Sequence, residues 1–506
     1  MYQGQYGSDA KRQFKAAGGD EGAVMTKAAM KRFLQEYPAA LNGGVGAVFV
    51  GAGMSMAAGY PSWAKLLREI GEEFGVNSRD IHDLAALAQW SIQESGSATR
   101  VRNVIKEQIG KDYPVPATLE VIARLPVGHI WTTNYDRLVE RAFDTIDRPL
   151  DTISGAKDLS LKPKPGAARL YKMHGSVDRL DDIVISTDDY ELFRSRRGAF
   201  LPLLQSHLTS MSMLFVGLSF TDPNIRHVLS LIRESFTDAP PEHFAIVRPP
   251  QPDDFDSEDE FKARLAQHTL WAKDLRRYGL IAVEIDDYEE VPELLRQIER
   301  RVAARRIWVS GSWPVEDGGP APANIYSLAE DVGRWVGKSG RDLVSGAGML
   351  VGSATIAGFL EALRDGGGWD LNRRLVARPF PQPLAGEMPD PARWTALRQE
   401  LARQAGVVVF IGGGKFDGET IVTAEGVIEE YAIAKEASAF LLPLGASGGA
   451  AKEVAELLIG SDVAFAGAYA ARPTDEELSL LLDPATERNA ILDCVAAIVD
   501  RLDKAG

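Results

Sequence analysis

Residues 45–63 read VGAVFVGAGMSMAAGYPSW and contain the pattern that decides the fold. A short apolar run, residues 45–50, leads into Gly51-Ala52-Gly53 and then into a segment of small residues. An apolar strand, a glycine turn and a helix start form the layout of a dinucleotide-binding turn, in which backbone N–H groups approach a pyrophosphate at a helix N-terminus. Taken alone, the pattern also fits an ordinary strand-to-helix turn, because the full GxGxxG motif is absent.

Length and composition bound the class of protein. A chain of 506 residues is long enough for two or three domains, and 45% apolar with 25% charged residues is ordinary for a globular protein. The net charge of −15 argues against a nucleic-acid or anionic-membrane surface. No apolar run reaches the ~20 residues that span a bilayer, and residues 1–14 lack the apolar core of a secretory signal. We therefore expect a cytoplasmic protein without nucleic-acid or membrane partners.

Cysteine is nearly absent from the chain. Cys494 is the only one, which excludes an intrachain disulfide and a cysteine zinc cluster. We expect no metal site.

The first half of the chain alternates short apolar strands with helices. Strands are predicted at 45–50, 168–173, 213–216, 244–247 and 280–285, and a further short strand that ends in polar residues is predicted within 128–136; several of these strands end in Gly, Ser, Thr, Asn or His. This alternation predicts an α/β fold with a doubly wound parallel sheet, on which ligands bind at the carboxyl ends of the strands. Residues 1–25 are expected to form a flexible tail, and the acidic, proline-bearing stretch 249–260 a surface loop.

A second α/β unit begins near residue 305. A charged helix at 291–306 leads to a new strand and glycine turn at 307–313, and similar units follow at 342–348 and 407–415. A last strand at 440–443 precedes helices at 450–458 and 490–502. The predicted domains are therefore 26–304 and 305–506, both Rossmann-like.

Four motifs of the first domain, in this order, together resemble the sirtuin family: Gly51-Ala-Gly-Met-Ser55 with Gly59-Tyr-Pro61, Thr133-Asn-Tyr-Asp136, Met173-His-Gly175, and Gly217-Leu-Ser219. The resemblance covers about residues 30–300 and implies an NAD-binding domain that cleaves the nicotinamide–ribose bond. Protein-deacylating sirtuins carry a four-cysteine zinc module, which a single cysteine cannot form. Residues 68–121 are predicted to be a helical insertion instead, and hydrolysis of NAD itself is favoured over deacylation.

The second domain is similar to the SLOG superfamily of nucleotide-binding Rossmann proteins. The motifs that carry this similarity are Val309-Ser-Gly-Ser312, Ser345-Gly-Ala-Gly348, Arg378-Pro-Phe-Pro381, Gly412-Gly-Gly-Lys415 and Gly426-Val-Ile-Glu-Glu430. A sirtuin-like domain joined to a SLOG domain resembles the effectors of Thoeris anti-phage defence. That resemblance implies an activating cyclic ADP-ribose isomer made by a TIR-domain partner, NAD depletion, and a homo-oligomer, either a tetramer or a filament.

Two residues are the catalytic candidates. His174 follows an apolar strand and precedes a glycine, and an imidazole of ordinary pKa near ~6.5 can accept a proton from a ribose hydroxyl. Asn134 offers a donor and an acceptor that could orient the ribose or a water molecule. A structural histidine and a turn-stabilising asparagine are the alternative interpretations.

The NAD-binding candidates surround these two residues. Ser55 is expected to contact a phosphate and Ser219 a ribose or phosphate, while Asp136 fits a helix cap and a ligand contact equally well. The full set of binding residues is Gly51, Ala52, Gly53, Ser55, Asp136, Gly217 and Ser219.

The candidates for the activator site lie in the second domain. A ligand with two phosphates needs backbone donors and fixed cations, and its ribose hydroxyls need an acceptor. We assign Gly311, Ser312 and Gly346 as backbone donors, Arg398 and Lys415 as cations, and Glu430 as the acceptor. For each charged residue, a solvated surface charge is the alternative.

The sequence thus predicts a two-domain NAD glycohydrolase switched on by a cyclic nucleotide. Two other functions stay open, a non-catalytic sensor that binds NAD or ADP-ribose and a zinc-free protein deacylase.

Overall fold

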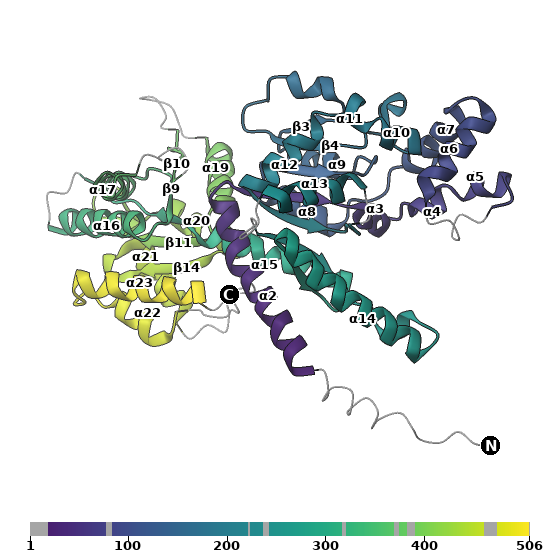
Figure 1. Cartoon of the computed structure of the whole chain (residues 1–506). Coiled ribbons are helices and arrows are strands. Elements are labelled where there is room, and N and C mark those ends of the chain that lie inside the picture. Colours follow the sequence, from purple (N-terminus) through teal and green to yellow (C-terminus); the bar gives the residue numbers. More distant parts are fainter. Residues whose placement is uncertain are drawn as a thin grey trace, which may run out of the picture. The chain divides into compact units, whose positions relative to one another are not determined.

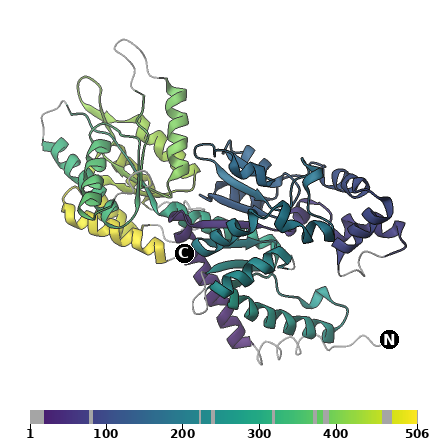
Figure 2. The ribbon, with the colours of Figure 1, turned by 45° about the horizontal axis from the view of Figure 1, so that its top comes forward.

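A computed structural model describes residues 19–76, 83–220, 223–235, 242–315, 320–368, 374–381, 390–459 and 473–504. The chain forms two compact units, Met1–Glu299 and Arg300–Gly506. The division lies within helix α15 (Val291–Ala304), slightly before the predicted boundary at 304/305. Each unit has its own sheet with helices packed around it (Figure 1, Figure 2).

The first unit contains a seven-stranded sheet in the order β3-β4-β2-β1-β5-β6-β7, in which every neighbouring pair is parallel. Its strands are β1 (Gly46–Val50), β2 (His129–Thr132), β3 (Leu150–Ile153), β4 (Ala168–Lys172), β5 (Ser212–Val216), β6 (His243–Val247) and β7 (Leu280–Glu284). The chain builds one side of the sheet from β1 and then crosses to build the other side from β5. The strand order therefore reverses between β1 and β5, where doubly wound sheets bind ligands.

Helices cover this sheet and form the predicted insertion. The described part of the predicted insertion, residues 68–121, consists mainly of helices, as predicted. The helices of this unit are α2 (Gly19–Asn42), α3 (Ala52–Ala58), α4 (Trp63–Leu66), α5 (Arg68–Glu73), α6 (Leu84–Ser95), α7 (Thr99–Ile109), α8 (Ala117–Arg124), α9 (Leu138–Asp144), α10 (Thr187–Glu191), α11 (Phe193–Arg196), α12 (Phe200–Ser210), α13 (Pro223–Ser235), α14 (Glu258–Leu275) and α15.

Three elements of the first unit show where the structure departs from the sequence prediction. Helix α2 begins at Gly19, inside the segment expected to be a tail, and residues 1–18 lie outside the described part. Helix α14 begins at Glu258, inside the expected acidic loop, because Ser257 caps it and three acidic residues occupy its first turn. Strand β3 was not predicted, since a half-buried edge strand of four residues lacks a continuous apolar run.

The second unit contains a five-stranded parallel sheet in the order β10-β9-β8-β11-β14 and an antiparallel hairpin, β12-β13. Alternate residues of β11 point into two separate cores, Val407 and Val409 into one, and Val408 and Phe410 into the other. Burial on both faces explains the continuous apolar run of this strand. The strands are β8 (Arg306–Ser310), β9 (Asp342–Ser345), β10 (Leu375–Ala377), β11 (Val407–Ile411), β12 (Gly414–Phe416), β13 (Ile421–Thr423) and β14 (Phe440–Leu444).

Helices cover both faces of this second sheet, and the two-domain α/β prediction is confirmed. Residues of α16, α17 and α23 enter the first core, and residues of α19, α20 and α21 enter the other. The helices are α16 (Pro320–Lys338), α17 (Val351–Asp365), α19 (Pro391–Gln404), α20 (Glu425–Glu436), α21 (Gly449–Leu458), α22 (Asp475–Leu482) and α23 (Arg488–Lys504). Among the helices of the described residues, none combines the length and apolar character needed to cross a membrane.

We predict that a buried histidine makes the first unit sensitive to mild acid. His243 is fully buried at the start of β6, where its Nδ1 accepts from the Met213 N–H at 3.2 Å. Burial lowers its pKa from 6.5 to about 4. Below pH 6.5 the unfolded chain therefore binds a proton that the folded chain does not. The free energy of unfolding therefore decreases as the pH falls from 6.5 toward 4, and at pH 5 it is lower than at pH 7 by ~2 kcal/mol.

Thermal unfolding followed between pH 7 and pH 5 measures this loss. The fall in melting temperature should be shallower in His243→Gln than in the unsubstituted protein. In His227→Gln, which alters a partly exposed histidine on α13, it should be unchanged. Equal slopes in all three proteins would contradict the assignment.

Candidate functional sites

The first sheet brings the predicted catalytic and binding residues to one edge. Val50 is in register with Thr132 on one side and with Val216 on the other, and Thr132 is in register with Lys172. Strands β4, β2, β1 and β5 therefore end at the same level. The residues that follow these ends include His174, Asn134, Gly51 and Gly217, so the four segments converge at the carboxyl edge, next to the point where the strand order reverses.

Glycines let the turns after β1 and β5 approach each other closely. The Gly51 N–H donates to the Val216 carbonyl at 2.8 Å, and the Gly53 N–H donates to the Gly217 carbonyl at 2.9 Å. A Cβ at position 51 would lie 2.3 Å from the Gly217 oxygen, and Gly217 itself has φ +67°. The N–H groups of Gly51 and Gly53 therefore bind backbone carbonyls of the protein. The sequence pattern alone had suggested that such N–H groups contact a phosphate. Ala52 begins α3 and is exposed.

We predict that Gly51→Ala damages the NAD site through this close approach. The added methyl group has to push the two turns apart, which should lower the free energy of unfolding by ~2 kcal/mol and weaken NAD binding at least tenfold. Gly128→Ala is the matched control, because a Cβ there meets nothing within 4 Å. Thermal melting and NAD titration measure both effects, and wild-type NAD binding by Gly51→Ala would contradict the prediction.

Asn134 lies in the turn after β2 and points to the β1 turn. Its side-chain Nδ2 donates to the Gly51 carbonyl at 2.9 Å, and its backbone N–H donates to the Thr132 hydroxyl at 3.0 Å. These two bonds fix the orientation of the amide. The Asn134 carbonyl oxygen is the acceptor that this geometry can present to a substrate or a water molecule.

Asp136 and Ser55 form a buried pair that the sequence did not predict. The Ser55 hydroxyl donates to Asp136 Oδ2 at 2.5 Å, and Asp136 Oδ1 accepts from the Leu138 N–H at 3.0 Å, at the start of α9. Asp136, one position before the N-cap residue Arg137, therefore satisfies the first N–H of α9, which corresponds to the helix-end role that the sequence left open beside ligand contact. Because the single hydroxyl proton of Ser55 is engaged with Asp136, a donated bond from Ser55 to a phosphate would require this pair to separate.

His174 is buried just beyond β4, with 3% of its surface exposed. Its ring contacts Tyr190 and Phe193 edge-on, with centroid distances of 5.4 and 6.1 Å. Its carbonyl accepts from the Val184 N–H at 3.0 Å, which closes the loop that follows. Ser219, in the turn after β5, is exposed.

Arg197 is buried against this loop and contacts three segments of the backbone and side chains around it. It is 2% exposed, donates to the carbonyls of Ser154 and Met173 at 2.8 and 3.3 Å, and pairs with the Asp182 carboxylate at 2.9 Å. Burial lowers its pKa. An isolated arginine in the sequence gave no signal of this role.

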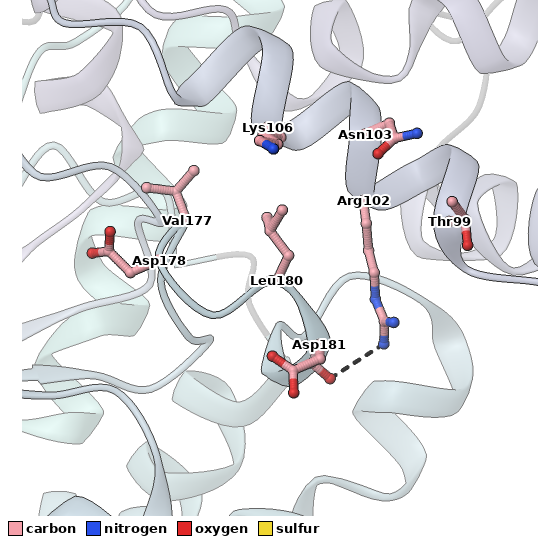
Figure 3. A pocket seen from close by; sticks show the side chains of 8 residues that line it. All are labelled: Thr99, Arg102, Asn103, Lys106, Val177, Asp178, Leu180 and Asp181. Atoms are coloured by element: carbon pink, nitrogen blue, oxygen red, sulfur yellow. Dashed lines mark hydrogen bonds between the residues drawn. The ribbon is translucent and has the colours of Figure 1, made fainter.

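An open cleft of about 480 Å³ separates the helical insertion from the segment just after His174. One wall consists of Thr99, Arg102, Asn103 and Lys106 of α7, and the other of Val177, Asp178, Leu180 and Asp181. Figure 3 shows Arg102 extending across the cleft to the Asp181 carbonyl, at 3.2 Å. The α7 wall thus carries the cations Arg102 and Lys106, and the opposite wall carries Asp178 and Asp181.

The second unit brings Glu430, Arg398 and Ser310 together at the end of β8. The Ser310 hydroxyl donates to Glu430 Oε2 at 2.5 Å, and Arg398 Nε lies 3.5 Å from Glu430 Oε1. Glu430 is 6% exposed, and burial raises its pKa from 4.5 to about 7. Arg398 also donates to Glu429 Oε2 at 2.6 Å. Arg398 and Glu430, two activator-site candidates that lie 32 positions apart in the sequence, therefore form one charged cluster.

Aromatic rings cover the Arg398 guanidinium. Its central carbon lies 5.1 Å from the Phe380 ring centroid and 5.8 Å from that of Trp394. Aromatic faces at these distances attract a guanidinium by cation–π interaction. Gly346 touches the same Phe380 ring, because a Cβ there would lie 2.5 Å from it.

The other activator candidates lie around the β11 turn. A Cβ at Gly311 would lie 2.0 Å from the Ile411 carbonyl oxygen. The turn after β8 therefore packs closely against the end of β11. The Ser312 carbonyl accepts from the N–H groups of Gly413 and Gly414 at 2.9 and 3.0 Å. Lys415 is exposed on the hairpin strand β12, opposite Val422. Sequence reasoning did not assign four residues of the Arg398 cluster to the site. Ser310, Phe380 and Glu429 lie within the quoted motifs, and Trp394 lies outside them.

Comparison with known proteins first defines the class of protein. Residues 290–502 match the Sir2- and TIR-associating SLOG family, and residues 128–269 match the SIR2-like domain. The chain is therefore a SIR2-like domain joined to a SLOG domain, which confirms the resemblance.

Whole-chain relatives define the family. The chain is 33% identical over 415 residues to the NAD(+) hydrolase ThsA of Bacillus cereus (strain MSX-D12), covering 81% of this chain and 85% of that protein. It is 32% identical over 419 residues to ThsA of Acinetobacter baumannii (strain 532279), covering 82% and 87%. Defense-associated sirtuin 2 of Bacillus subtilis is 25% identical over 213 residues, 40% of this chain and 21% of that protein. The chain belongs to the ThsA family of NAD(+) hydrolases.

Proposed function

We propose that this protein hydrolyses NAD to ADP-ribose and nicotinamide in defence against phage, and that a cyclic ADP-ribose isomer bound to the second unit activates it. The convergence of Asn134 and His174 beside the β1 and β5 turns is the observation that supports the catalytic part. Relatives named NAD(+) hydrolase support the same reaction, and a relative named defense-associated sirtuin supports the setting.

In the proposed reaction, water replaces nicotinamide at the anomeric carbon of the ribose. The glycosidic carbon–nitrogen bond breaks, its electron pair leaves with nicotinamide, and the water oxygen bonds to the carbon while one proton is released. In this proposal, the side-chain carbonyl of Asn134, whose Nδ2 donates to Gly51, holds the water or the ribose, and the His174 imidazole accepts a proton from a ribose hydroxyl. An amide dipole near the cationic ribosyl group also stabilises it.

The Arg398 cluster is the proposed activator site. A stacked guanidinium suits a phosphate, and the Glu430 carboxylate suits ribose hydroxyls. Gly311, Ser312, Gly346 and Lys415 complete the proposed set. A ligand at this site activates only if it binds the active arrangement more tightly than the inactive one. We further propose a TIR-domain enzyme as the source of the ligand and a homo-oligomer, tetrameric or filamentous, in the cytoplasm.

The test is NAD consumption by the purified protein, with and without a panel of cyclic ADP-ribose isomers. Nicotinamide release that rises with one isomer supports both parts of the proposal. Absence of release with every isomer would favour a non-catalytic sensor, and turnover of an acetylated peptide would favour a deacylase. Constant release without any isomer would retain the enzyme and contradict the activator site.

A further inference from the structure

Lys172, the last residue of β4, is buried where a charge is expensive. Its side chain is 1% exposed, and its ammonium group reaches the turn after β2. It donates to the Asp136 carbonyl, lies 3.4 Å from the Tyr135 carbonyl and forms an ion pair with Glu140 at 2.8 Å. An ammonium has three donors, and these are the three acceptors that it meets.

The stability of the fold alone does not explain why position 172 is a lysine rather than an apolar residue. Lysine is rarely buried to this extent, and taking an ammonium out of water costs several kcal/mol before its partners compensate. An apolar side chain at the end of a buried strand avoids that cost. What lysine adds is a connection between two neighbouring strand ends, because its carbonyl partners belong to the residues that directly follow Asn134.

The connection continues across the sheet edge. From the other side, Asn134 donates to the Gly51 carbonyl of the β1 turn. The turn that carries Asn134 is therefore held between Lys172 on β4 and Gly51 after β1. His174 lies two residues beyond Lys172 on the same segment. Lys172 thus links the two proposed catalytic segments to each other.

We propose that Lys172 is a positioning residue for NAD cleavage, which acts by fixing the carbonyls after Asn134 and hence the orientation of the Asn134 amide. This inference rests on the proposed NAD hydrolysis. A reactive group displaced by about 1 Å loses as much as roughly a hundredfold in rate. Loss of Lys172 should therefore reduce kcat more than it changes KM for NAD.

The main experiment compares Lys172→Met with Arg148→Met. Arg148 is a matched control, because it also clamps backbone carbonyls, those of Ala123, Leu125 and Val127, but before β2 rather than after it. Both variants should melt at lower temperature. We expect Lys172→Met to lose roughly 10- to 100-fold in kcat with KM within about threefold, and Arg148→Met to keep its kcat. An unchanged kcat in Lys172→Met, or an equal loss in both variants, would overturn the inference.

A double-mutant cycle tests whether Lys172 acts through Asn134. In an Asn134→Ala background, Lys172→Met should cause little further loss of kcat, whereas independent effects would multiply and contradict the inference. If Lys172→Met does not fold, Lys172→Arg keeps the charge with a different shape, and its kcat should fall while its melting temperature stays nearer to wild type. Wild-type kcat in a folded Lys172→Arg variant would count against a role in precise positioning.

Hydrogen exchange separates this inference from the proposed function. Absence of NAD cleavage in the unsubstituted protein would contradict the function only. Backbone amides of residues 133–138 should then still exchange faster in Lys172→Met than in Arg148→Met, since the turn loses its clamp. Equal protection of this segment in both variants would overturn the positioning role in either case.

Discussion

Replacing His174 by alanine is expected to lower NAD turnover by roughly a hundredfold or more, the range lost with a general base. His174 is buried beside Tyr190 and Phe193 at the edge where four strands end, so a bulk water molecule cannot replace the imidazole freely. Nicotinamide release at saturating activator measures the loss. Activator binding, which we assign to the other unit, should be unchanged.

The matched control is His268→Ala. His268 lies on α14, where its Nε2 is 3.3 Å from Glu284 at the end of β7, two strands away from β5 in the sheet. It should keep wild-type turnover. Full turnover by His174→Ala would remove the catalytic assignment of this residue. A loss of activator binding in the same variant would instead contradict the division of work between the two units.

Periodicity made most of this fold predictable. Strands such as β1, β6 and β11 are buried on both faces, so their sequences are continuous apolar runs that stand out between glycine turns. Strands β3 and β10 escaped prediction because they are short and only partly buried. Strand order is harder, because parallel pairing joins residues far apart in the chain. The sequence analysis therefore predicted a doubly wound parallel sheet but no strand order.

The sequence could predict only those site residues that follow directly after an apolar strand. His174, Asn134 and Gly51 follow apolar runs directly, and the parallel sheet carries them to one edge. Contacts between side chains gave no local signal: Ser55 and Asp136 are 81 positions apart, and Lys172 binds carbonyls that every residue possesses. Gly51 and Gly53 show that a recognisable pattern can also mislead. Their pattern predicted that the N–H groups contact a phosphate, whereas these groups bind carbonyls at the end of β5 and in the turn after it.

The second large effect is expected for Arg398→Ala, which should raise the activator concentration for half-maximal turnover at least roughly a hundredfold. The substitution removes the guanidinium that stacks on Phe380 and Trp394 and pairs with Glu429. Arg403→Ala is the matched control, because Arg403 is exposed on the same helix, α19. Titration of NAD turnover with the activator measures both variants.

The size of the Arg398 effect comes from its coupling to Glu430. Burial raises the Glu430 pKa to about 7, and the Arg398 charge opposes that rise. Without Arg398 that opposition is lost and the Glu430 pKa rises further, so the protonated form, which accepts fewer hydrogen bonds than the carboxylate, becomes more populated at pH 7. One substitution therefore removes the cation for a phosphate and weakens the acceptor for a ribose. Raising the pH should restore part of the Glu430 contribution but not the cation. Arg398→Ala that responds to the activator as wild type does, at pH 7, would place the activator elsewhere and leave exposed Lys415 as the stronger candidate.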